Sequence, residues 1–155
     1  SRKPNPTLEL ININEVIESV LPLIHYNKMP AVKIEIEKIF AENMPQIRGD
    51  LHQLQEVFLN ILINAYQSMP NGGKIKIITS NFQNLYAQIK IIDSGIGITA
   101  QNLKHIFMPF FSTKSEGTGL GLSICHNIIK NHNGSIELES QVNQGSTFTI
   151  KLPFI

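Results

Sequence analysis

Hydrophobic and polar positions along the chain recur with two different periods, and each period predicts a different kind of element. Apolar residues occupy every second position in several short stretches, a pattern typical of half-buried β-strands. Elsewhere they recur at spacings of three and four, which is typical of amphipathic helices. The strands predicted from the first pattern are Thr7–Ile13 (as an edge strand), Lys33–Phe40, Lys74–Ser80, Tyr86–Ile92, Ser135–Ser140 and Ser146–Leu152.

Three long helices follow from the second pattern. The first begins after Asn12, which with Glu15 resembles a capping box, and Pro22 is expected to kink or shorten it. The second, Asp50–Met69, begins at an aspartate cap, and the third is Thr118–Asn131. Strands on one side and helices on the other predict an α+β two-layer sandwich, a mixed β-sheet of about five strands backed by three α-helices.

Bulk composition narrows the functional class. The 155 residues are 42% hydrophobic and 16% charged, as expected of one globular domain. A formal net charge of +1 gives no sign of the excess positive charge typical of proteins that bind nucleic acid. One cysteine allows no internal disulfide. No apolar run is long enough to cross a membrane, so we expect no direct membrane contact and a cytoplasmic location. Residues 1–6 are expected to be a linker and residues 7–155 the domain; a membrane anchor in a longer parent protein stays open.

The second helix carries two different faces. Its apolar set, expected to face the sheet, is Leu51, Leu54, Phe58, Ile61 and Ala65. A second set falls in one narrow stripe: Gln53, Glu56, Asn60, Asn64 and Gln67. The stripe is either a solvated face or a row of amide oxygens that holds a metal ion and phosphates. The residues alone favour the solvated face.

Two glycine-rich loops flank a long connection. In the first, Asp93–Ile98, a carboxylate at the end of an apolar strand can meet a ligand's amino group, although a tight turn explains the same residues. In the second, Gly117–Ser123, glycines at the start of a helix favour phosphate binding. The connection, Ile98–Glu116, is long enough to be a lid, with one short helix near Asn102–Ile106 and with Lys114 within reach of a phosphate.

The order of these segments resembles the catalytic domain of sensor histidine kinases over nearly the whole chain. The four matching segments are Asn60–Ala65 (N box), Asp93–Ile98 (G1 box), Phe107–Lys114 (F box) and Gly117–Leu122 (G2 box). The runs Met69–Ile75 and Gly145–Phe148 are most similar to the nitrogen-regulation and sporulation branch. The resemblance implies a mixed sheet backed by three helices, and ATP and magnesium as cofactors.

The resemblance also implies roles for individual residues. Asn64 would coordinate magnesium with help from Asn60, and Asp93 would accept a hydrogen bond from the adenine amino group. Gly95 and Gly97 would admit the base, while Phe110 and Phe111 would anchor the lid and touch a neighbouring helical domain. The implied phosphate contacts are Lys114, Gly117, Thr118, Gly119, Leu120 and Gly121.

The chain has no histidine that suits the role of phosphoacceptor. None of the five is followed by an acidic residue on a long amphipathic helix, so all are expected to be surface or structural: His25, His52, His105, His126 and His132. The resemblance therefore implies a separate phosphoacceptor and dimerisation domain in the same kinase, and a response regulator downstream. Three alternatives remain: an ATP-hydrolysing switch of the gyrase or chaperone kind, an anti-sigma-type serine kinase, and a non-binding adaptor. Asn60 argues against the first, because the hydrolysing relatives have a glutamate there.

Overall fold

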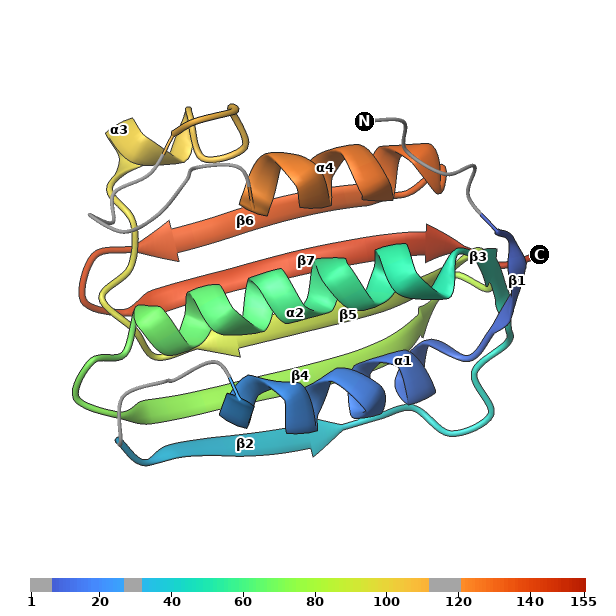
Figure 1. The fold of residues 1–155 in the computed structure, drawn as a ribbon, viewed down its shortest axis with the longest axis horizontal. Coiled ribbons are helices and arrows are strands. Elements are labelled where there is room, and N and C mark those ends of the chain that lie inside the picture. Colours follow the sequence, from blue (N-terminus) through green and yellow to red (C-terminus); the bar gives the residue numbers. More distant parts are fainter. Residues whose placement is uncertain (1–6, 27–31, 112–120) are drawn as a thin grey trace.

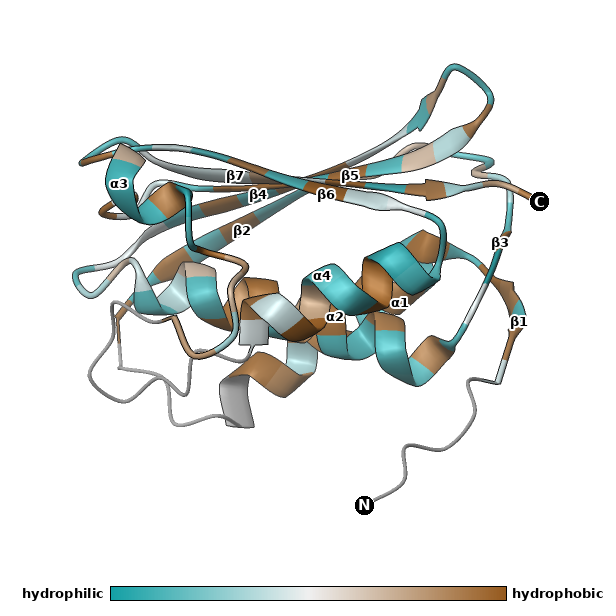
Figure 2. Cartoon of the chain, turned by 90° about the horizontal axis from the view of Figure 1, so that it is seen from above, coloured by the Kyte–Doolittle hydropathy of each residue, from teal (hydrophilic) through white to brown (hydrophobic). Residues whose placement is uncertain are grey.

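The main layer of the fold is a five-stranded sheet with the long helices on one of its faces (Figures 1 and 2). The structure, a computed structural model, describes residues 7–26, 32–111 and 121–155. In spatial order the strands are β2 (Ile34–Ile39), β4 (Gly73–Phe82), β5 (Tyr86–Asp93), β7 (Gly145–Pro153) and β6 (Ser135–Gln141). β2 is parallel to β4, and the other neighbouring pairs are antiparallel. The predicted α+β class and mixed sheet are confirmed.

The first strand belongs to a second, smaller sheet. β1 (Glu9–Ile11) pairs antiparallel with β3 (Ile47–Gly49) and not with the main sheet. The prediction of a strand over Thr7–Ile13 was therefore too long, and β3 was missed. A three-residue strand is too short to show an alternating pattern, so the sequence offered no periodic signal for β3.

The long helices are α1 (Ile13–Val20), α2 (Leu51–Gln67) and α4 (Gly121–Asn131). As expected from Pro22, the α-helical part of the first helix stops early and continues as the 3-10 helix η1 (Leu21–Tyr26). Asn12 caps α1, but its side chain accepts from the N–H of Asn14 at 2.9 Å, so the predicted capping box is wrong in detail. Of the predicted third helix, residues 118–120 lie outside the described residues.

A short helix, α3 (Ala100–Leu103), begins the connection after β5. It starts two residues before the predicted Asn102 because Thr99 is its cap, with the Thr99 hydroxyl accepting from the N–H of Asn102 at 3.2 Å. No helix among the described residues is long and apolar enough to cross a membrane.

The core lies between the helices and the sheet, and α2 runs over the middle of the sheet (Figure 1). Four of the five apolar residues expected to face the sheet are buried; Leu51 is only half-buried. The buried side chains of α2 are Leu54, Val57, Phe58, Ile61, Leu62, Ala65 and Tyr66. Each large one contributes about 1.5–3 kcal/mol on burial, which fixes the height and rotation of α2 above the strands. The polar stripe of α2 is thereby held in one direction.

Candidate active site

Asp93 is a buried carboxylate at the end of a strand. On β5 every second residue is buried, and Asp93 continues the inward series of Ile89 and Ile91 with an exposed fraction of 5%. A carboxylate in such a position needs hydrogen-bond donors, because burial without them is costly. The predicted candidate residue therefore occupies a site where an apolar side chain would be the ordinary choice.

Two backbone donors converge on one oxygen of Asp93. Its Oδ1 accepts from the N–H of Gly95 at 2.9 Å and from the N–H of Ser146 at 3.2 Å. The Ser68 hydroxyl lies 3.4 Å from the same oxygen, but its one proton has a closer acceptor in the Ala65 carbonyl oxygen at 2.7 Å. Ser146 faces Asp93 across the β5–β7 ladder, and Ser68 lies at the end of α2. Sequence reasoning missed both serines, since the contacts depend on strand register and on where α2 ends. Together the donors fix the carboxyl group in one orientation.

The glycines after Asp93 are required by the protein's own backbone. A Cβ on Gly95 would lie 2.1 Å from the Ser68 hydroxyl oxygen, and one on Gly97 would lie 2.0 Å from the carbonyl oxygen of Gln141. Gly97 also has a φ of +74°, which L side chains rarely adopt. This close packing explains both glycines without a ligand. Their predicted role in admitting a base stays a prediction.

The polar stripe of α2 faces α4 and is divided between two places. Gln53 and Glu56, near the start of α2, line a cavity together with residues of α4. Asn60 lies farther along, where α4 begins: a Cβ on Gly121 would be 3.9 Å from its Cγ. Asn64, one turn beyond Asn60, is half-buried. Asn60 thus lies where α2 meets the start of α4, and whether the stripe holds a metal ion stays a prediction.

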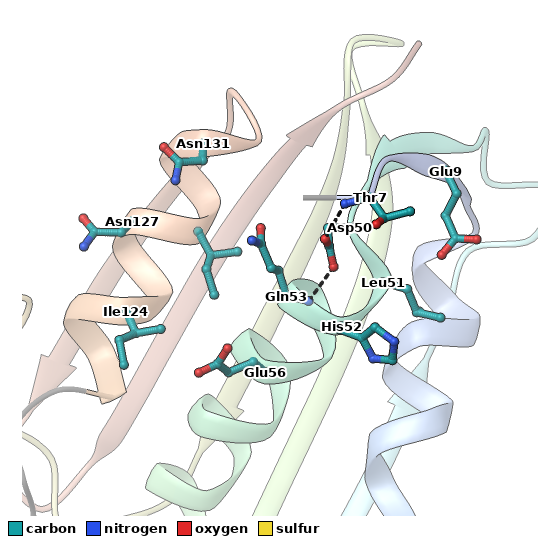
Figure 3. Close-up of a pocket in the computed structure, with 11 residues that line it drawn as sticks. Thr7, Glu9, Asp50, Leu51, His52, Gln53, Glu56, Ile124, Asn127 and Asn131 are labelled. Carbon is teal, nitrogen blue, oxygen red and sulfur yellow. Dashed lines mark hydrogen bonds between the residues drawn. The ribbon is translucent and has the colours of Figure 1, made fainter. Parts of the chain in front are cut away.

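The cavity at the start of α2 has a volume of about 590 Å³ and lies between α2, α4 and the chain before β1 (Figure 3). In this close-up Asn127 and Asn131 project from α4 and Glu56 from α2. Asn60, Asn64 and Asp93 are not among its lining residues. Glu56 is thus placed apart from the predicted nucleotide residues, although it shares their stripe.

Asp50 fixes the start of α2. One of its oxygens accepts from the N–H of Gln53 at 3.0 Å and the other from the N–H of Thr7 at 2.9 Å, which confirms the predicted cap. Burial alone raises the pKa of Asp50, but these two N–H groups and the nearby His52 favour the carboxylate, so its pKa is lowered overall. The bond to Thr7 also ties the start of the described chain to α2.

The predicted lid is described only in its first part. Phe107 lies against α4, with its ring centroid 5.6 Å from that of His126, and Phe111 lies 5.9 Å from His105. Phe110 is 78% exposed, so its expected anchoring role is wrong and Phe107 contacts the domain instead. The remaining predicted residues lie outside the described residues: Lys114, Gly117, Thr118, Gly119 and Leu120.

The donor set suits an adenine nucleotide with magnesium. Asp93 supplies a pure acceptor, Asn60 supplies an amide oxygen beside the start of α4, and Asn64 supplies a second, half-buried amide one turn along α2. Among the described residues no group of three His, Cys, Asp or Glu could hold a metal ion. A magnesium ion commonly uses one or two protein oxygens together with phosphates and water, so amide oxygens beside a nucleotide fit it.

Comparison with known proteins identifies the family. Residues 49–155 match the model of the histidine kinase-, DNA gyrase B-, and HSP90-like ATPases. The chain belongs to this family. Sporulation kinase C of Bacillus subtilis (strain 168) is 40% identical over 148 residues, covering 95% of this chain and 34% of that protein. The sensor histidine kinase ZraS of Escherichia coli (strain K12) is 40% identical over 148 residues, covering 94% of this chain and 31% of that protein.

Solved structures place this ATPase among the histidine kinases as well. The catalytic domain of the histidine kinase ThkA matches with a TM-score of 0.81 and 31% identity, covering 95% of this chain and 97% of that one. The chain spans about a third of the length of the curated relatives it matches, 34% and 31%. The predicted assignment to the ATPase catalytic domain of sensor histidine kinases is confirmed, and the sporulation-like branch is supported only loosely by the names of relatives.

Proposed function

We propose that this domain binds Mg-ATP and presents its γ-phosphate to a histidine on a separate helical domain of the same kinase. A response regulator would then receive the phosphate. The observation that carries the proposal is Asp93, a carboxylate that is 5% exposed and oriented by two backbone N–H donors at the end of β5. A buried carboxylate can only accept hydrogen bonds, so it favours adenine, whose exocyclic amino group donates, over guanine, which presents a carbonyl oxygen there.

The phosphate and metal roles would fall to residues where α2 meets the start of α4. Asn64, assisted by Asn60, would offer an amide oxygen to magnesium, and Gly121 would place the N-terminus of the 11-residue helix α4 near the phosphates. The further phosphate contacts that we propose are Lys114, Gly117, Thr118, Gly119 and Leu120. When bound, magnesium neutralises charge on the phosphate that is transferred. The protein's own part is to hold the nucleotide in line with the incoming nucleophile.

The acceptor histidine is proposed to lie in another domain. Among the described histidines, His132 is buried in a structural contact, while His52 and His105 are exposed. Residues 1–6 would link residues 7–155 to that domain, and the exposed Phe110 would contact it. We propose a cytoplasmic location for the domain, with no nucleic-acid partner and no membrane contact of its own.

Nucleotide selectivity tests the adenine site. Calorimetry on the 155-residue chain should show binding of ATP and ADP and much weaker binding of GTP. Asp93→Asn should remove this selectivity yet keep the fold, because the asparagine retains one oxygen for the donors from Gly95 and Ser146. Glu139→Gln is the matched control, since Glu139 is an exposed carboxylate near the same strand end. Equal affinity of the unmodified chain for ATP and GTP would refute the proposal.

Phosphoryl transfer tests the metal site. In the longer kinase that contains this domain, Asn64→Ala should abolish magnesium-dependent autophosphorylation and leave the stability of the domain nearly unchanged, because Asn64 lies outside the core. Gln55→Ala is the control: it removes an amide from the same helix, at a position that bonds Ser19 on α1. Wild-type transfer by the Asn64 variant would exclude Asn64 as the ligand.

A further inference from the structure

The last row of side chains on the helix-facing side of β5, β7 and β6 is polar, whereas the rows before it are apolar. The strand register gives two consecutive apolar rows: Ile89, Ile150 and Ile136, then Ile91, Phe148 and Leu138. The next row consists of Asp93, Ser146 and Ser140. Polar groups at the edge of a core need hydrogen-bond partners, so the contacts of the two serines indicate why they are there.

The Ser140 hydroxyl makes three contacts. Its Oγ accepts from the N–H of Ile98 at 2.8 Å, donates to the carbonyl oxygen of Gly145 at 3.0 Å and lies 2.7 Å from the Oγ of Ser146. A hydroxyl has one proton and two lone pairs, and a carbonyl oxygen can only accept. All three contacts are therefore hydrogen bonds when Ser140 donates to Gly145 and Ser146 donates to Ser140. In this arrangement the Ser146 proton is directed to Ser140 and not to Asp93.

The two segments that Ser140 joins are the ones that orient Asp93. The loop after β5 supplies the N–H of Gly95, and β7 supplies the N–H of Ser146. Ser140 bonds the same loop at Ile98 and the same strand at Ser146. One side chain on β6 thus connects the sources of both donors to the carboxylate.

We propose that Ser140 is a positioning residue for the adenine site: its hydroxyl holds the loop after β5 and the start of β7 at the spacing where both N–H groups meet one oxygen of Asp93. This inference rests on the proposed role of Asp93 in binding adenine. Without the hydroxyl, Ile98 loses this acceptor and the hydroxyl of Ser146, directly opposite Asp93 in the ladder, can turn and donate to the carboxylate. Since hydrogen bonds are directional, a carboxylate that turns toward Ser146 is a poorer acceptor for the adenine amino group.

The competing interpretation is that Ser140 only stabilises the hairpin between β6 and β7. The loop after β5 has two further backbone bonds, from the N–H of Asn143 to the Ile96 oxygen at 2.8 Å and from the Ile96 N–H to the Ser68 oxygen at 3.0 Å. If these bonds suffice, a folded variant without the hydroxyl should bind ATP like the wild type. If Ser140 positions Asp93, a folded variant should lose ATP affinity and keep its GTP affinity.

Four variants separate the hydroxyl from the shape of the side chain. Ser140→Thr and Ser140→Val add the same β-branched bulk, which suits a strand, and differ only in the hydroxyl. Ser140→Ala removes the hydroxyl without added bulk. Ser135→Ala is the matched control, because Ser135 is five residues earlier on β6 and an odd spacing places its side chain on the opposite face of the sheet.

Calorimetry with magnesium and ATP or GTP measures the consequence, at a temperature where unfolding curves show each protein to be folded. Ser140→Val and Ser140→Ala should reduce the ATP affinity of the 155-residue chain by about tenfold, the order of one lost hydrogen bond. Their GTP affinity should stay within about twofold of the wild type. Ser140→Thr and Ser135→Ala should stay within about twofold for both nucleotides.

NMR spectroscopy of the nucleotide-free chain tests the positioning itself. We expect the carboxyl ¹³C resonance of Asp93 to move in Ser140→Val and Ser140→Ala, and to stay near its wild-type position in Ser140→Thr and Ser135→Ala. The amide proton of Ile98 should exchange with solvent faster in Ser140→Val than in Ser140→Thr, because only threonine keeps an acceptor for it. An Asp93 resonance that is unchanged in all four variants would overturn the proposal.

The outcomes separate this inference from the proposed function. If Asp93→Asn keeps the wild-type selectivity for ATP, the proposed adenine site is wrong, and the positioning role fails with it. If Asp93→Asn loses selectivity but Ser140→Val and Ser140→Ala keep it, only the positioning role is overturned. Losses that are equal for ATP and GTP, or equal in Ser140→Thr and Ser140→Val, would also overturn it, because neither pattern depends on the hydroxyl acting through Asp93.

Discussion

The ring of His132, which follows α4, joins that helix to the start of α2 by accepting a hydrogen bond from Asp50. The Nε2 of His132 is 3.0 Å from the backbone nitrogen of Asp50, and its Nδ1 is 2.8 Å from the carbonyl oxygen of Ile128. A backbone N–H can only donate and a carbonyl can only accept, so the ring carries its proton on Nδ1. One neutral imidazole thus satisfies two buried backbone groups.

Replacing the ring of His132 should destabilise the domain, because it removes a hydrogen-bond acceptor from a buried backbone N–H. We expect His132→Phe to reduce the free energy of unfolding by about 1–3 kcal/mol, because the N–H of Asp50 is left buried without an acceptor. Urea unfolding of the 155-residue chain measures the change. His52→Phe, at an exposed position in the first turn of α2, is the control and should change stability by less than about 0.5 kcal/mol. Equal effects of the two variants would contradict this role for His132.

The cap formed by Asp50 should make stability depend on acidity. Asp50→Ala is expected to cost about 1 kcal/mol at neutral pH, the usual effect of removing a helix cap. Because the folded pKa of Asp50 lies below its ordinary value of 3.8, the unfolded state binds more protons in that range and stability falls as the pH falls. The difference between wild type and Asp50→Ala should therefore be full above about pH 5 and shrink as the pH drops below 3.8.

Unfolding curves of both proteins at several pH values between neutral and acidic conditions measure this dependence. Asp50→Asn serves as a second variant, since an asparagine also caps helices but carries no charge to titrate. A wild-type advantage that stays constant into acid would show that the charge of Asp50 contributes nothing.

Two glycines should respond differently to the same substitution. Gly97→Ala should destabilise the domain by more than about 2 kcal/mol, because it adds backbone strain to a Cβ placed 2.0 Å from the carbonyl oxygen of Gln141. Gly121→Ala should not destabilise it, since the nearest atom of another described residue would be 3.9 Å from the new Cβ and alanine favours helices. Thermal unfolding of the two variants makes the comparison. A loss of stability at Gly121 as large as at Gly97 would be unexpected.

The fold could be predicted because its signals are local. Alternating burial marks β4 and β5. Asp50 marks the start of α2, because its side chain accepts a hydrogen bond from the N–H of Gln53, three residues later. β3 left no such signal, because it is three residues long and its pairing with β1 joins segments far apart in the chain.

The candidate site was predictable in its residues and not in its contacts. Asp93 was found from its place at the end of an apolar strand. The contacts of Asp93 with Ser68 and Ser146 arise from helix ends and strand register, which the sequence does not display. The same limit applies to Asn60, because its neighbour Gly121 is far along the chain and their approach depends on how α2 and α4 pack. Gly95 and Gly97 were expected to leave room for a bound base. In the structure they instead leave room for Ser68 and Gln141, which an added Cβ would meet.

Slow ATP hydrolysis is the expectation that most sharply separates this domain from the hydrolysing branches of its family. Attack by water needs a base that takes up a proton as the bond to phosphorus forms, and the amide of Asn60 cannot do so. Glu56 is one turn away, about 5.4 Å along the helix, and lines the cavity at the start of α2. Figure 3 draws its carboxylate among the residues that line this cavity, and Asn60 is not one of them. The chain should bind ATP and release phosphate very slowly.

Substitution at position 60 provides the decisive measurement. If the geometry resembles that of the hydrolysing relatives, Asn60→Glu should raise phosphate release by up to about 100-fold, the lower range for general-base catalysis, without raising transfer to histidine in the longer kinase. Asn60→Gln is the matched control, since it has the length of glutamate but no basic oxygen charge. Glu56→Gln should leave the low rate unchanged. Rapid ATP turnover by the unmodified chain, insensitive to Glu56→Gln, would show that a group other than Asn60 and Glu56 activates water, and that Asn60 does not reserve the nucleotide for a histidine.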